Sequence, residues 1–108
     1  MYYTYKEIEL TLGLYFIAKQ HLYEMNMEES SKANQTTFMD LYNYYSYIVH
    51  LVDSWLLLLF PDEILLLEMR IDKGMGFDDI SIVLGYANHS SVLRKYRQII
   101  TKIKLRVN

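Results

Sequence analysis

The chain has 108 residues, 52% of them hydrophobic, with one proline and no cysteine. This length corresponds to one domain with a modest core, and the composition excludes a disordered chain, a disulfide framework and a thiolate metal site. The absence of cysteine suits a cytoplasmic protein. The N-terminus lacks the basic start and apolar core of a secretory signal. The longest apolar run, residues 47–60, is shorter than the roughly 20 residues of a bilayer span, so we expect no membrane contact.

Charge is unevenly distributed along the chain. The formal net charge is only −2, but residues 80–108 contain six Lys or Arg and no Asp or Glu. Residues 1–79 contain five Lys or Arg against thirteen Asp or Glu. An acidic body with a basic tip is the distribution expected of a small nucleic-acid-binding protein.

The first predicted helix begins at Thr4 and runs to about residue 27. Thr4 and Glu7 have the spacing of a capping box, in which each side chain accepts the other residue's backbone N–H. The apolar positions that follow are broad enough to predict burial on more than one side of the helix. They form a main stripe, Ile8, Leu12, Tyr15, Phe16 and Leu22, which is widened by Leu10, Leu14 and Ile17.

A second long helix is predicted over residues 37–60, after a polar loop at residues 26–37. Thr37 and Asp40 repeat the cap signal. Nine of the eleven tyrosines lie between Tyr2 and Tyr47, so residues 1–60 would form a helical hairpin with large aromatic faces. Those faces suit packing within the chain or a homodimer through the hairpin, and both interpretations stay open.

Residues 61–108 are predicted to form three further helices. Pro61 suits the first turn of one helix, which Lys73 and Gly74 close. Residues 77–84 form a short helix, and Gly85 supplies the left-handed residue that ends it. Residues 90–106 form a longer basic helix. The sequence thus predicts an all-α fold of about five helices, with the hairpin (1–60) and a helix-turn-helix module (61–108) in a single compact domain.

The segment from about residue 57 to residue 104 resembles region 4 of bacterial sigma factors, whose second motif helix enters the DNA major groove. It is also similar to the C-terminal module of phage late-gene regulators of the ArpU and RinA type, which are short chains with helices in front. The resemblance implies a DNA-binding transcription regulator of phage or mobile-element origin. The matching features are Pro61-Asp62-Glu63, Asp78-Asp79-Ile80-Ser81, Leu84-Gly85 and the basic helix after Ser90.

Candidate DNA contacts follow from the helical wheel of residues 90–106. With Val92, Tyr96 and Ile99 facing inward, the outward side chains include Arg94, which can bond a guanine edge, and Gln98, which can bond an adenine edge. Flanking basic and polar residues are better placed for phosphates, which position the protein without reading sequence. The base-reading candidates are Ser91, Arg94 and Gln98; the phosphate candidates are His89, Ser90, Lys95, Arg97 and Lys102.

An enzyme is not expected, because the sequence has no glycine-rich phosphate loop and no convincing acid–base pair. No cofactor or metal is expected either. The alternative to a DNA-binding regulator is a protein-interaction module that binds RNA polymerase or another regulatory protein and contacts little or no DNA. Salt dependence separates the two, because affinity that rests on phosphate contacts falls steeply with salt.

Overall fold

In the computed structural model, residues 2–27 and 35–108 are described, and these ranges contain helices and no strand. The predicted all-α class is therefore confirmed. Part of the expected loop, residues 28–34, lies outside the described residues. The elements are α1 (Tyr5–Met27), α2 (Gln35–Leu56), α3 (Pro61–Leu67), a π-helical segment η1 (Glu68–Asp72), α4 (Phe77–Leu84) and α5 (His89–Val107). Within the described ranges, no helix has both the length and the apolarity that crossing a membrane requires.

The start of α1 is fixed by the predicted capping box. The Thr4 N–H donates to Glu7 Oε1 at 2.9 Å, and the Glu7 N–H donates to Thr4 Oγ1 at 3.1 Å. One face of the helix is fully buried, as Ile8 and Leu12 show at 0% and 1% exposure. The expected burial of a second face does not occur within the chain, because three apolar side chains remain exposed: Leu10, Leu14 and Ile17.

The predicted bounds of α2 are wrong at both ends. The helix begins at Gln35, so Thr37 lies inside it, and it ends at Leu56 instead of Phe60. Proline disfavours helical backbone in the residue before it, and Phe60 is indeed extended, with φ −80° and ψ 157°. The chain unwinds ahead of this residue through two tighter turns, which Leu58 N–H and Leu59 N–H form with the carbonyls three residues back, at 3.0 and 3.1 Å.

The helix that starts at Pro61 does not continue as an α-helix. It passes into η1, where the Lys73 N–H reaches back five residues to the Glu68 carbonyl at 3.0 Å. Gly74, with φ 65°, then reverses the chain. A π-turn takes one more residue per hydrogen-bonded ring than an α-turn. A hydrophobic period of 3.6 could therefore not predict this segment.

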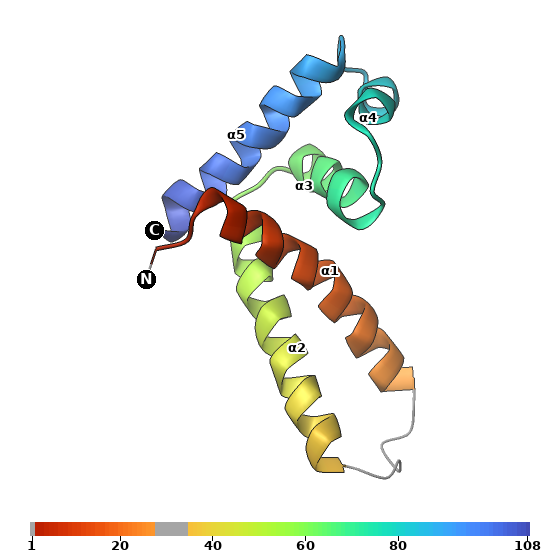
Figure 1. Cartoon of the computed structure of the whole chain (residues 1–108), viewed down its shortest axis with the longest axis vertical. Helices are drawn as coiled ribbons and strands as arrows, with labels where there is room; N and C mark the ends of the chain where they lie inside the picture. The colour runs from red at the N-terminus through yellow and green to blue at the C-terminus, as the bar shows by residue number, and fades with distance from the viewer. Residues whose placement is uncertain (1, 28–34) are drawn as a thin grey trace.

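One hydrophobic core joins both halves of the chain. The N-terminal half of α1 and the C-terminal end of α2 meet α3, α4 and α5 in a single buried cluster, so residue 60 does not separate two cores. The molecule is elongated, at 52 × 32 × 20 Å, because the α1–α2 pair projects beyond this cluster (Figure 1). Among residues 19–27 and 37–51, no side chain is fully buried.

The two ends of the described chain are joined beside this core. The Tyr3 N–H donates to Asn108 Oδ1 at 2.7 Å, and Asn108 Nδ2 donates to the Tyr3 carbonyl at 2.8 Å. Nearby, the Tyr96 hydroxyl donates to Glu9 Oε2 at 2.7 Å and so connects α5 to α1. These bonds hold the C-terminal end of α5 against the start of α1, where both termini lie in Figure 1.

Helices α4 and α5 pack against each other across a short turn. Gly85 ends α4 with φ 78° and ψ 25°, which confirms the predicted left-handed conformation. Ile80 is fully buried and Ser81 nearly so, and the Ser81 hydroxyl donates to the Asp78 carbonyl at 2.6 Å. Val83, three residues after the buried Ile80, is 57% exposed.

Candidate nucleic-acid interface

The first turn of α5 is capped by Asn88. Its side-chain oxygen accepts from the Ser91 N–H at 3.0 Å and from the Ser91 hydroxyl at 3.1 Å. The helix therefore begins at His89, one residue before the predicted start. Asparagine is a preferred N-cap residue, so this signal was present in the sequence. Ser91, predicted to read bases, is half-buried and bonded to the cap, which leaves its hydroxyl poorly placed for a ligand.

The buried side of α5 agrees with the helical wheel, since Val92, Ile99 and Ile103 are fully buried and Tyr96 nearly so. The opposite side is solvent-exposed along almost the whole helix. We call it the α5 outer face and define it by its exposed residues: Ser90, Arg94, Arg97, Gln98, Thr101, Leu105 and Arg106.

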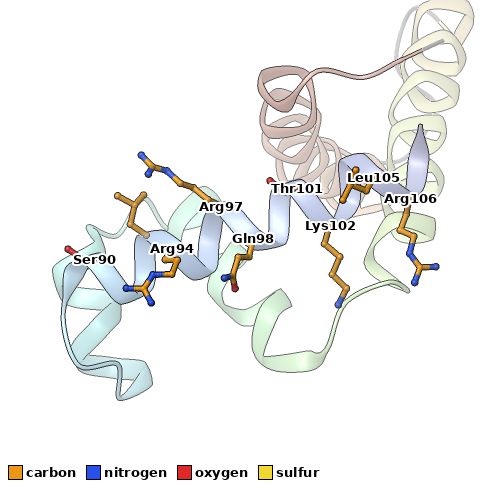
Figure 2. A pocket seen from close by; sticks show the side chains of 9 residues that line it. Ser90, Arg94, Arg97, Gln98, Thr101, Lys102, Leu105 and Arg106 are labelled. Carbon is orange, nitrogen blue, oxygen red and sulfur yellow. The ribbon is translucent and has the colours of Figure 1, made fainter.

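The α5 outer face is an open surface and not an enclosed pocket. A hollow of about 710 Å³ runs along it, but α5 supplies every residue that lines it. Figure 2 shows Arg94 and Gln98 pointing to one side of the helix and Arg97 pointing to the other. An open helix face with polar groups on both flanks suits a large polyanion better than a small molecule, which needs an enclosed pocket.

The arginine side chains of this face form no hydrogen bond or ion pair within the described residues. Within residues 2–27 and 35–108, Arg94, Arg97, Gln98 and Arg106 have neither a hydrogen-bond nor an ion-pair partner that would compete with a ligand. No acidic residue occurs in α5. The arginine at position 106 was not among the predicted contacts, although its position in the last basic turn could have suggested it.

Lys95 and Lys102, both predicted to bind phosphate, have a different partner. Lys95 Nζ lies 3.0 Å from Glu63 Oε2, and Lys102 Nζ lies 3.0 Å from Glu63 Oε1. The two lysines are seven residues apart, so both reach the same side of α5, where α3 presents this carboxylate. Both ammonium groups are thus engaged by one carboxylate, so these lysines support α5 and are less free to bind phosphate than the exposed arginines.

Glu63 is itself buried, with 4% of its side chain exposed. Burial alone would raise the pKa of its carboxyl group. Hydrogen bonds from the Phe60 N–H, Lys102 and Lys95 outweigh that effect, and the pKa is lowered. The bond from the Phe60 N–H measures 2.9 Å, and Lys102 Nζ also lies 4.7 Å from the centre of the Phe60 ring. Sequence reasoning missed this buried charge because Glu63 looks like an ordinary acidic residue in the first turn of a helix.

His89 is engaged at the other end of the site. Its Nδ1 lies 3.3 Å from Asp78 Oδ1, and its ring meets the Phe77 ring edge-on at 5.7 Å. Phe77 in turn lies under the Arg70 guanidinium, at 4.1 Å, and Arg70 donates to the Met75 carbonyl at 3.0 Å. These contacts fix α4 against the start of α5. Ser90, beside His89, is exposed at the tip of the α5 outer face.

No family model, no curated protein and no solved structure matches this chain. In the part of the chain that the structure describes, no group of three or more His, Cys, Asp or Glu is arranged to hold a metal ion.

Proposed function

We propose that this protein binds double-stranded DNA through the α5 outer face and acts as a small transcription regulator. The observation that carries the proposal is the set of three exposed arginines, Arg94, Arg97 and Arg106, on a helix that has no acidic residue. That helix follows a short helix and a glycine turn, the layout of a helix-turn-helix. The sequence resemblance to sigma region 4 and to phage regulators of the ArpU and RinA type adds an origin in a phage or mobile element.

The roles divide by position on the helix. Arg94 and Gln98 share one flank of α5, near its N-terminal half, which is the part of a recognition helix that usually reaches base edges. Arg94 would bond guanine O6 and N7, and Gln98 would bond adenine N6 and N7. Arg97 and Arg106 would contact phosphates, with Ser90 at the tip, while His89, whose Nδ1 lies 3.3 Å from Asp78 Oδ1, would hold α4 beside them.

Glu63 has an indirect role in this proposal. It lies on α3, and Lys95 and Lys102 lie on α5, so the two ion pairs join the helix ahead of the motif to the proposed recognition helix. A recognition helix must be held rigidly to align several side chains with successive base pairs. We therefore infer that Glu63, Lys95 and Lys102, which we call the Glu63 cluster, fix the orientation of α5 without contacting DNA.

Fluorescence anisotropy with labelled duplexes from the chain's own genomic neighbourhood tests the proposal. We expect Arg94→Ala combined with Arg97→Ala to weaken binding at least a hundredfold. Lys19→Ala combined with Lys73→Ala also removes two exposed charges, both outside α5, and should change binding less than threefold. Equal losses in both variants would show that only net charge matters. Unchanged binding in the double arginine variant would exclude α5 as the binding element.

One observation favours the protein-interaction alternative. Ile82 and Val83 are adjacent on α4 and are 79% and 57% exposed, which gives that helix an apolar surface beside its acidic start. RNA polymerase or another regulator could dock there. If Ile82→Ser and Val83→Ser abolish regulation in a reporter assay while DNA affinity stays normal, a protein partner acts at this surface. If they leave regulation intact, the alternative loses its support.

A further inference from the structure

Helix α1 exposes a line of residues on the side away from Ile8 and Leu12, and at its middle Gly13 and Ile17 form one wall of a hollow whose other wall belongs to η1. At 100° per residue, Leu10 and Ile17 point roughly 180° away from Ile8 and Leu12. Leu10 is 62% exposed and Ile17 is 54% exposed. Lys6, Gly13 and Glu24 continue the same line at spacings of three, four and seven residues. We call this line the α1 seam: Lys6, Leu10, Gly13, Ile17 and Glu24.

Gly13 lies near the middle of this seam, and the chain itself gives no reason for a glycine there. Its φ is not positive, and a Cβ built on it would meet nothing within 4 Å. A glycine in a helix interior destabilises the helix relative to alanine. What the missing side chain provides is a depression on the α1 surface, one turn from the exposed Ile17 side chain, where another helix can approach closely.

The charges at the two ends of the seam are complementary. The side chains of Lys6 and Glu24 are 80% and 54% exposed. Within the described residues their partners are local to α1 and lie at the surface: Lys6 Nζ is 3.8 Å from Glu9, Glu24 Oε2 is 4.0 Å from His21 Nδ1, and Gln20 donates to Glu24 Oε1 at 3.0 Å. Two copies of α1 placed antiparallel would bring each Lys6 opposite Glu24 of the second copy. Parallel copies would instead place like charges together.

The steric and electrostatic pairings require the same register. Residues 6 and 24 are centred on position 15, and so are residues 13 and 17. One antiparallel alignment therefore sets Lys6 against Glu24 and, at the same time, seats each Ile17 in the depression at Gly13 of the second copy. Closely paired helices usually seat side chains of one helix in depressions on the surface of the other.

We propose that the α1 seam is the interface of a symmetric homodimer in which two α1 helices pair antiparallel. The projecting part of the α1–α2 pair has no fully buried side chain among residues 19–27 and 37–51, and the α1 seam extends along its α1 side as far as Glu24. This proposal does not depend on DNA binding. If α5 does bind DNA, the two-fold axis presents two recognition helices to a palindromic site.

Sedimentation equilibrium of the full chain from about 1 to 200 μM tests the interface. We expect a monomer–dimer equilibrium and at least a tenfold weaker dimer for Ile17→Gln. Leu57→Gln is the control, because it makes a comparable change at an exposed aliphatic residue outside the seam and should leave the dimer constant within twofold. A monomer throughout, or equal effects of both substitutions, would overturn the proposal.

A charge exchange tests the antiparallel register. Lys6→Glu and Glu24→Lys should each weaken the dimer by threefold or more, since each places like charges together. The double variant carries both changes in every copy, restores opposite charges, and should return the dimer constant to within twofold of the wild-type value. Circular dichroism of each variant checks that the helices remain. A double variant that is weaker than both single variants would contradict the antiparallel arrangement.

Discussion

Lys102 Nζ lies 3.0 Å from Glu63 Oε1, across the contact between α5 and α3. Lys95 binds the second oxygen of the same carboxylate at 3.0 Å. Glu63 is thus a buried negative charge held by two lysines of α5 and by the Phe60 backbone. Removing one partner of such a group is costly, because the remaining charge loses part of its compensation. We therefore propose two purposes for the basic residues of α5: Lys95 and Lys102 support the fold, and the exposed arginines contact DNA.

The first prediction separates these two purposes by stability. Lys102→Met should lower the free energy of unfolding by about 1–3 kcal/mol, because Glu63 loses a charged hydrogen-bond donor. Arg94→Ala should change it by no more than about 0.5 kcal/mol, since this side chain is exposed and unpaired in the described part of the chain. Urea denaturation followed by circular dichroism measures both. Equal stability of the two variants would show that the Glu63 cluster contributes little.

The second prediction concerns acid sensitivity. The pKa of Glu63 is lowered from its ordinary value of 4.5, so its ionised form stabilises the fold above that pH, and the contribution is lost as pH falls below it. Glu63→Gln should be less stable than wild type at pH 6, and the difference should shrink as pH is lowered to about 3. The check is urea denaturation of both proteins across this range. A constant difference would mean that the carboxylate charge is not what stabilises the cluster.

The third prediction concerns the turn before α5. Gly85 has φ 78°, a conformation that is strained for β-branched residues and tolerated by asparagine. Gly85→Val should cost about 1–3 kcal/mol of stability, and Gly85→Asn should cost clearly less. Thermal unfolding of the two variants provides the comparison. A Cβ built at Gly85 meets nothing within 4 Å, so equal losses would mean that any side chain at this φ has the same cost and that β-branching adds none.

Much of the fold was predictable because it depends on local signals. The capping box at Thr4, the proline at the start of α3, the glycine after α4 and the apolar spacing of α5 each have a short-range cause. The start of α2 was misplaced because threonine is favoured at helix N-caps, whereas Thr37 lies inside the helix. Its end was misplaced because the apolar pattern continues to Phe60, although Pro61 already requires extended backbone there.

The candidate site was only partly predictable, because burial of a charge depends on tertiary packing. A helical wheel shows which α5 residues point away from the core, and Arg94, Arg97 and Gln98 are indeed exposed. It cannot show that α3 lies along one flank and presents a carboxylate to Lys95 and Lys102. The same limit applies to α1, where apolar spacing suggested burial but Leu10 and Ile17 remain exposed.

The most direct test of DNA binding by α5 is the salt dependence of binding to a specific duplex. For wild type we expect log affinity to fall linearly with log salt, and Arg97→Ala to reduce the slope by about 0.9, one phosphate contact. Arg94→Ala should cost about 1–3 kcal/mol on the specific duplex and much less on a scrambled one. Affinity that is independent of salt, or identical in all three proteins on both duplexes, would contradict DNA binding through the α5 outer face.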